Sequence, residues 1–204
     1  MRIISGVYKG RLIKMPKGIR PSRDKVRKAL FDILGDIEGV SLLELFAGSG
    51  AIAIEALSQG VKEVVLVERD PECIKIIKDN FSLLDYTGYT LIPLEVPQAL
   101  NRLSKAGRKF DLIFMDPPYY AECSNSSRDC FDIPKHFQRS DYIRDQSMAK
   151  KTLQILTSYD ILTPSGFIVV EHFKKDNLPD TLGDLVLFRQ YKYADTVLSF
   201  YRKK

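Results

Sequence analysis

Short apolar runs alternate with helical patterns along most of the chain. Five runs, SLLELF, KEVVLVE, TLIPLE, FDLIFMD and GFIVVE, are nearly continuous, as expected for strands buried on both faces of a sheet. The segments between them place apolar residues at helical spacing, and two of them open with proline. The alternation predicts a doubly wound α/β domain. The expected strands are 41–46, 62–68, 90–95, 110–116 and 166–171, and the expected helices are 48–60, 71–84, 96–105 and 150–162.

Both ends of the chain depart from this alternation. Residues 185–204 contain two apolar runs around a polar turn near Tyr193, which predicts a closing antiparallel hairpin and a mostly parallel, seven-stranded sheet. The first 18 residues alternate apolar pairs with Gly, Lys and Arg and predict a small basic β-hairpin, followed by a helix that opens at Pro21 and Ser22. We therefore expect a basic extension over 1–35 and the α/β domain over 36–204. Residues 121–146 show no clear periodicity.

Charge is distributed unevenly. Residues 1–30 hold ten Lys or Arg against the single acid Asp24, a net charge of +9, whereas the other 174 residues carry −4. A basic end on a mildly acidic protein indicates contact with a polyanion, here a nucleic acid. The alternative is a merely solvated terminus.

Composition excludes several other classes. No apolar run approaches the roughly 18 residues of a membrane span, and charges occur throughout the first 30 residues, which argues against a secretory signal. The three cysteines are too few for a disulfide framework, so we expect a cytoplasmic protein. Cys123, Cys130 and His136 match no common zinc spacing, and no metal is expected. Nothing in the sequence requires more than a monomer.

A glycine-rich turn follows the first strand. Gly48, Gly50 and Ala53 give G-x-G-x-x-A, and Glu68 ends the next strand. This layout also occurs in NAD sites, so the turn alone indicates a nucleoside-containing cofactor whose ribose Glu68 would bind. Glu44 favours S-adenosylmethionine, because a carboxylate suits its ammonium group and not a pyrophosphate. The alternative for Glu44 is a cap of the turn. Glu95 is expected to contact adenine or else to be an exposed acid at a strand end.

The segment DPPY ends the fourth expected strand. Prolines cannot continue a paired central strand, so Asp116 and Tyr119 should lie at the sheet edge where such folds bind ligands. Asp116 and the carbonyl of Pro117 would accept hydrogen bonds from a base amine, Pro118 would stiffen the loop, and Tyr119 would stack on the base. A simple turn with Tyr119 capping the core is the alternative. Because DPPY comes after the glycine turn and Glu68 in this order, the segment favours methyl transfer as the reaction.

Several segments together resemble the bacterial guanine-N2 methyltransferases of 16S ribosomal RNA (RsmD-like). The similar segments are MRIISGVYKGRLIKMPKG, RPSRDKVRKALFDIL, LLELFAGSGAIAIEAL, VVLVERD, DPPY, GFIVVEH and YADTVLSFY. They cover most of the chain outside residues 120–150. DPPY alone is shared with DNA adenine methyltransferases, so the matches at the two ends favour the ribosomal RNA enzymes.

The resemblance implies a Rossmann-like class I methyltransferase fold, with ribosomal RNA or the small ribosomal subunit as partner. It implies S-adenosylmethionine at the cofactor-binding residues Glu44, Phe46, Ala47, Gly48, Ser49, Gly50, Glu68 and Glu95, and the target guanine at the catalytic residues Asp116, Pro117, Pro118 and Tyr119. Together with the charge pattern, it indicates RNA binding by Arg2, Lys9, Arg11, Arg20, Pro21, Ser22, Arg23 and Arg27. A DNA adenine-N6 methyltransferase and an inactive RNA-binding scaffold remain alternatives. His136 and His172 are expected to be non-catalytic.

Overall fold

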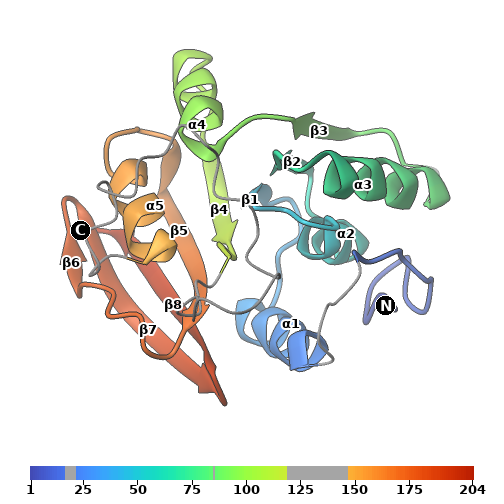
Figure 1. The fold of residues 1–204 in the computed structure, drawn as a ribbon, viewed down its shortest axis with the longest axis horizontal. Coiled ribbons are helices and arrows are strands. Elements are labelled where there is room, and N and C mark those ends of the chain that lie inside the picture. Colours follow the sequence, from blue (N-terminus) through green and yellow to red (C-terminus); the bar gives the residue numbers. More distant parts are fainter. Residues whose placement is uncertain (17–21, 85, 119–146) are drawn as a thin grey trace, which may run out of the picture.

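A single mixed sheet organises the protein in the computed structural model, which describes residues 1–16, 22–84, 86–118 and 147–204 (Figure 1). The strands follow the order β3-β2-β1-β4-β5-β8-β7-β6 across the sheet. Their bounds are β1 Ser41–Leu45, β2 Glu63–Val67, β3 Tyr89–Ile92, β4 Phe110–Met115, β5 Leu162–Phe173, β6 Thr181–Leu182, β7 Leu185–Tyr193 and β8 Thr196–Lys203. The helices are α1 Ser22–Leu34, α2 Ala51–Ser58, α3 Pro71–Leu83, α4 Val96–Lys105 and α5 Met148–Leu156.

The strand directions confirm the predicted arrangement. Strands β3, β2, β1, β4 and β5 are parallel, and β8 and β7 add antiparallel to β5 and to each other. The described residues contain eight strands rather than the seven expected. The additional strand, β6, has only two residues and pairs with β7 at the sheet edge. A strand this short has no apolar pattern from which the sequence could predict it.

Two hydrophobic layers cover the sheet. Leu42 and Val64 point to one face, where α1, α2 and α3 pack, and their neighbours Leu43 and Val65 point to the other, where α4 and α5 pack. This explains the continuous apolar runs, because alternate residues of each central strand are buried under different helices. Because β1 pairs in parallel with β2 and with β4, the carboxyl ends of these three strands meet at one edge of the sheet. No helix in the described residues is long and apolar enough to cross a membrane.

The predicted N-terminal hairpin is reduced to one β-bridge, between Arg2 and Leu12. A few backbone bonds cross the hairpin, such as Ile3 N–H to the Arg11 carbonyl at 3.0 Å and Ile13 N–H to the Met1 carbonyl at 2.9 Å. Other donors bond to α2 instead: Glu55 accepts from Ile4 at 3.0 Å, and the Ser58 hydroxyl accepts from Tyr8 at 2.9 Å. The segment is thus folded onto α2 instead of forming a regular ladder. Its apolar residues Ile3 and Ile13 belong to the same core as α1, α2 and α3.

Two element boundaries near residue 160 differ from the predictions by several residues. The helix expected over 150–162 ends at Leu156, and β5 begins at Leu162 instead of at Gly166. A register shift follows, because Phe110 pairs with Leu162 while Leu112 pairs with Phe167, so residues 163–166 bulge from the strand. Residue 164 is proline, which a bulge tolerates.

Candidate functional site

The glycine-rich turn joins β1 to α2 at the carboxyl edge of the sheet. Its backbone is left-handed at three positions, with φ of 58° at Phe46, 54° at Gly48 and 72° at Gly50. A Cβ at Gly50 would lie 3.1 Å from Cδ2 of Leu66, whereas a Cβ at Gly48 would meet no atom within 4 Å. Gly50 therefore allows the turn to pack closely against the core, and Gly48 leaves the outer side of the turn open to a ligand.

The Glu68 carboxylate holds this turn in place. Its Oε2 accepts a hydrogen bond from the Gly48 N–H at 2.8 Å, and its Oε1 accepts from the N–H groups of Arg69 and Asp70 at 2.8 and 2.9 Å. Sequence reasoning expected Glu68 to bind ribose hydroxyls. In the structure the same side chain also fixes the position of Gly48. Each carboxylate oxygen keeps a further lone pair, which could accept a hydrogen bond from a ligand.

Glu44 lies beneath the turn, near the end of β1. It is 3% exposed, and its Oε2 accepts a hydrogen bond from the Ala53 N–H at 2.9 Å, at the start of α2. Burial raises the pKa of Glu44 to about 8, and the charges of Glu68 and Asp116 act in the same direction, against the helix N–H groups that lower it. The capping function weighed from the sequence is thus present.

These carboxylates determine which ligand charge the edge accepts. Glu44, Glu68 and Asp116 come from the ends of β1, β2 and β4, and their charges oppose one another. A bound cation would relieve this repulsion, while a pyrophosphate would increase it. The residues present therefore fit the ammonium and sulfonium of S-adenosylmethionine and do not fit a dinucleotide.

The proline-rich segment leaves the sheet where predicted. Strand β4 ends at Met115, and Asp116 is half-buried, Pro117 is buried and Pro118 is exposed. The stiffened backbone places Asp116 at the edge that also carries the glycine turn. Tyr119, expected to stack on a base, lies outside the described residues, so its function stays a prediction.

Glu95 pairs with Arg69 across the ends of β3 and β2. The Arg69 Nη1 lies 2.6 Å from the Glu95 Oε1, and both side chains are about half exposed, at 47% and 45%. Strand β3 ends at Ile92, earlier than expected, so Glu95 lies at the N-cap of α4, without a side-chain capping bond. An adenine contact by Glu95 stays a prediction and would have to share the carboxylate with Arg69.

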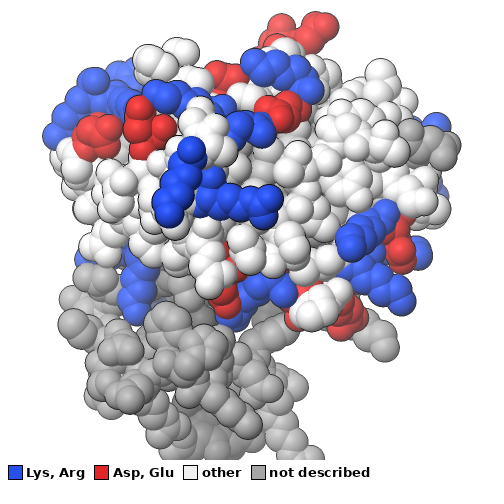
Figure 2. All heavy atoms as spheres, turned by 90° about the horizontal axis from the view of Figure 1, so that it is seen from above, with Lys and Arg blue, Asp and Glu red and all other residues white. Residues whose placement is uncertain are grey.

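Most basic residues expected to bind RNA are at the surface or outside the described part of the chain. Arg2, Lys9 and Arg11 are exposed, and the Arg11 guanidinium lies 5.3 Å from the Tyr8 ring centroid. Ser22 and Arg23 belong to the first turn of α1, while Arg20 and Pro21 lie outside the described residues. On the face seen in Figure 2, by contrast, cationic and anionic side chains are interspersed.

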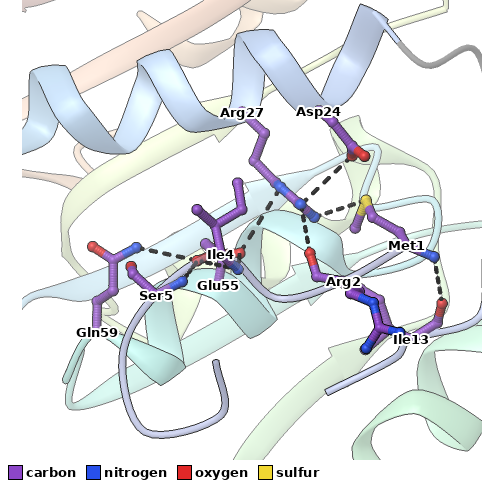
Figure 3. Close-up of polar contacts among 9 residues, drawn as sticks. All are labelled: Met1, Arg2, Ile4, Ser5, Ile13, Asp24, Arg27, Glu55 and Gln59. Atoms are coloured by element: carbon purple, nitrogen blue, oxygen red, sulfur yellow. Dashed lines mark hydrogen bonds and ion pairs between the residues drawn. The ribbon is translucent and has the colours of Figure 1, made fainter. Parts of the chain in front are cut away.

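Arg27 does not fit the RNA-facing position expected for it. It is 5% exposed, its Nη2 donates to the Arg2 carbonyl at 2.8 Å, and its Nε lies 3.9 Å from the Glu55 Oε2 (Figure 3). Burial lowers the pKa of Arg27, and the charge of Glu55 opposes this. Because the N-terminal segment folds over α1, the guanidinium joins that segment to α1 and α2 instead of reaching solvent.

Sequence reasoning missed Asn80, on α3. It is fully buried, and its side-chain carbonyl accepts from the Lys14 N–H at 2.7 Å. Its amide donates to the carbonyls of Lys14 and Ser49, both at 3.0 Å. Asn80 thus fixes the N-terminal basic segment against the glycine turn. The available signal was a polar residue beside Ile77 and Phe81 on the apolar face of the expected helix.

The remaining chemistry-bearing residues are structural or not described. His172 is buried, and its Nε2 lies 2.7 Å from the Ser199 hydroxyl. Burial lowers the pKa of His172, which favours the neutral ring. Within the described ranges no group of His, Cys, Asp and Glu could hold a metal ion, while Cys123, Cys130 and His136 lie outside them.

Comparisons with known proteins agree with this fold. The chain is 35% identical over 208 residues to the putative rRNA methyltransferase YlbH of Bacillus subtilis, with all of both chains covered. It is 33% identical over 207 residues to the ribosomal RNA small subunit methyltransferase D of Escherichia coli, covering 100% of this chain and 90% of that one. The solved structure of the putative methyltransferase yhhF from Escherichia coli superposes with a TM-score of 0.76 at 26% identity, covering 100% and 98%. Residues 1–133 match the model of the family described as conserved hypothetical protein 95. The chain therefore belongs to this family and has its Rossmann-like methyltransferase fold.

Proposed function

We propose that this protein transfers a methyl group from S-adenosylmethionine to the N2 amine of a guanine in small-subunit ribosomal RNA. The observation that carries the proposal is the group of Glu44, Glu68 and Asp116 around an open glycine turn, which fits a cationic cofactor beside a hydrogen-bond acceptor for the base. The names of the relatives supply the substrate class, ribosomal RNA. The guanine and its N2 atom come from the sequence resemblance.

The cofactor would lie along the turn. Gly48 gives it room, Glu68 would bind the ribose hydroxyls with its remaining lone pairs, and Glu44 and Asp116 supply negative charge near the ammonium and sulfonium. When bound, S-adenosylmethionine supplies a methyl group on a good leaving group. Phe46, Ala47 and Ser49 would contribute backbone contacts, and Glu95 a contact to adenine.

Asp116 and the carbonyl of Pro117 would activate the target amine. An exocyclic base amine is a poor nucleophile because its lone pair is delocalised into the ring. Hydrogen bonds from its N–H groups to these two acceptors would draw the nitrogen toward a tetrahedral shape and direct the lone pair at the methyl carbon. As the N–C bond forms and the S–C bond breaks, the amine proton passes to Asp116 or to water. Pro118 would stiffen the loop and Tyr119 would stack on the base.

The RNA side of the protein would be the basic extension over 1–35, acting with the domain over 36–204. Arg2, Lys9 and Arg11 are exposed there, and Asn80 connects the segment to the glycine turn. The substrate would be ribosomal RNA or the small ribosomal subunit, and the protein would act in the cytoplasm as a monomer. Arg27 is not included among the RNA contacts because it is buried.

Replacing Asp116 by alanine tests catalysis separately from binding. For an enzyme, Asp116→Ala should lower methyl transfer by about a hundredfold or more while RNA affinity changes little. Asp184→Ala, which removes an exposed acid before β7, is the matched control and should leave both unchanged. An inactive RNA-binding scaffold would bind RNA equally in all three proteins and transfer no methyl group.

A further inference from the structure

A hollow of about 580 Å³ lies between the N-terminal segment and α1, apart from the carboxylate edge. Its described lining comes from the N-terminal segment and from α1. The N-terminal segment contributes Met1, Arg2, Ile3, Ile4 and Leu12, and α1 contributes Asp24, Lys25, Arg27 and Lys28. Its size is within the range of small-molecule sites. The function proposed above assigns no task to Leu12, Lys25 or Lys28.

The lining combines apolar walls with positive charge. Leu12 is 59% exposed, so its side chain is accessible to a ligand in the hollow. Four of the described lining residues are basic and only Asp24 is acidic. Lys25 is exposed, and Lys28 is paired only loosely, with its Nζ 3.3 Å from the Asp32 Oδ2 on an open surface. An exposed ion pair of this kind contributes little to stability, so Lys28 would readily exchange Asp32 for a ligand anion.

The walls are fixed by buried groups behind them (Figure 3). The fully buried Glu55 accepts from the N–H groups of Ile4 and Ser5 at 3.0 and 2.9 Å. Arg27 donates to the Arg2 carbonyl and approaches Glu55 and Asp24 at 3.9 and 3.5 Å. The shape of the hollow is therefore set before a ligand arrives, which lowers the entropic cost of binding.

The hollow is also tied to the proposed cofactor turn. Leu12 precedes by two residues Lys14, whose backbone is bonded to Asn80, and Asn80 donates to the Ser49 carbonyl. An occupant of the hollow is thus held at a fixed place relative to the glycine turn.

We propose that this hollow is a subsite for one unpaired nucleotide of the RNA substrate outside the methylated guanine, with its base against Leu12 and its phosphates at Lys25, Lys28 and Arg2. The inference rests on the proposed function for the identity of the polyanion. A nucleotide fits because it combines a flat, weakly polar face, which can pack on an apolar side chain, with an anionic backbone that the lysines attract. A phosphate alone would leave Leu12 unused.

Direct binding tests the subsite without depending on methyl transfer. The probes are a fluorescent single-stranded fragment of small-subunit ribosomal RNA and inorganic polyphosphate, titrated at several salt concentrations. Lys25→Ala/Lys28→Ala should weaken RNA binding about tenfold and lower the salt slope by about 1.4. Leu12→Ser removes apolar contact area and should weaken RNA binding about fivefold, while leaving polyphosphate binding unchanged.

Two controls match these variants. Val7→Ser removes an aliphatic side chain, 80% exposed, from the same segment but outside the described lining, and Arg102→Ala/Lys105→Ala removes two exposed charges from the last turn of α4. If Leu12→Ser behaves as Val7→Ser does, or the lysine pair as the α4 pair does, the subsite is refuted, as it is if the wild-type protein binds no RNA. RNA binding that depends on Leu12 and Lys25 without methyl transfer would support the subsite and reject the proposed function.

Discussion

Asn80 and Lys14 exchange two hydrogen bonds across 66 residues of sequence, from the Lys14 N–H at 2.7 Å and to the Lys14 carbonyl at 3.0 Å. The same side chain donates to the carbonyl of Ser49 in the glycine turn. One buried amide therefore holds together the basic N-terminal segment, α3 and the proposed cofactor loop.

Replacing Asn80 by alanine should destabilise the protein by about 3 kcal/mol, because it leaves the partly buried backbone groups of Lys14 and the buried carbonyl of Ser49 without this partner. Urea unfolding measures this loss. Asn101→Ala, at an exposed position of α4, is the control and should have almost no effect. In the folded Asn80→Ala protein, the Kd for S-adenosylmethionine should rise as well. An unchanged cofactor affinity would mean that Asn80 does not position the turn.

The raised pKa of Glu44 makes the stability of the cofactor-free protein depend on pH. The folded state favours the protonated acid, since burial raises this pKa from 4.5 to about 8. The contribution of Glu44 is therefore fully present below the unfolded pKa and is lost as pH rises through about 8. Glu44→Gln imitates the neutral acid and should be more stable than wild type at about pH 9 and equally stable at about pH 4. Urea midpoints that differ equally at both pH values would contradict this.

The cofactor should also change the protonation of Glu44. A cation bound near Glu44, Glu68 and Asp116 favours the ionised acid, so binding near neutral pH should release up to about one proton. Calorimetry in buffers of different ionisation enthalpy counts this proton. Glu44→Gln should bind S-adenosylmethionine more weakly and release none, whereas equal release by both proteins would assign the proton to another group.

The two glycines of the turn should respond differently to alanine. Both have left-handed φ, which costs about 1–2 kcal/mol for any other residue. Gly48→Ala should add only this strain but place a methyl group in the space proposed for the cofactor, and so abolish cofactor binding. Gly50→Ala should cost more stability because its Cβ would also press on Leu66 at 3.1 Å. Cofactor binding that survives Gly48→Ala would place the ligand elsewhere.

Arg27 should matter for folding and not for RNA contact. Arg27→Ala leaves the fully buried Glu55 without its cationic neighbour and should destabilise the protein by about 3 kcal/mol. Chemical unfolding and RNA titration of the remaining folded protein separate the two effects. Lys25→Ala should do the reverse, with stability unchanged and RNA affinity lowered. A loss of RNA affinity by Arg27→Ala without loss of stability would restore it as an RNA contact.

Local sequence patterns predict the central strands and the turns that follow them. Continuous apolar runs identify the central strands because both sheet faces are covered, and the glycine turn and the two prolines mark where the chain leaves β1 and β4. The carboxyl edge follows from parallel strand order, so Glu44, Glu68 and Asp116 are brought together as expected.

Contacts between segments far apart in the sequence could not be predicted from local patterns. The sequence pattern assigned Arg27 to a polar helix face, and only the folding of residues 1–5 over α1 buries it. The N-terminal hairpin was predicted from apolar alternation, and a few backbone bonds do cross it, but Glu55 and Ser58 accept from the backbone donors of Ile4 and Tyr8, so no regular ladder forms. Both outcomes depend on side chains more than 20 residues away.

Transfer of labelled methyl groups from S-adenosylmethionine tests the central claim most directly. The acceptors are small ribosomal subunits from cells that lack this enzyme, protein-free small-subunit ribosomal RNA and duplex DNA. We predict label in the ribosomal RNA, released on digestion as N2-methylguanosine and absent with Asp116→Ala. Label in DNA alone, released as N6-methyladenine, would contradict the account, as would ribosomal RNA labelled on any other atom.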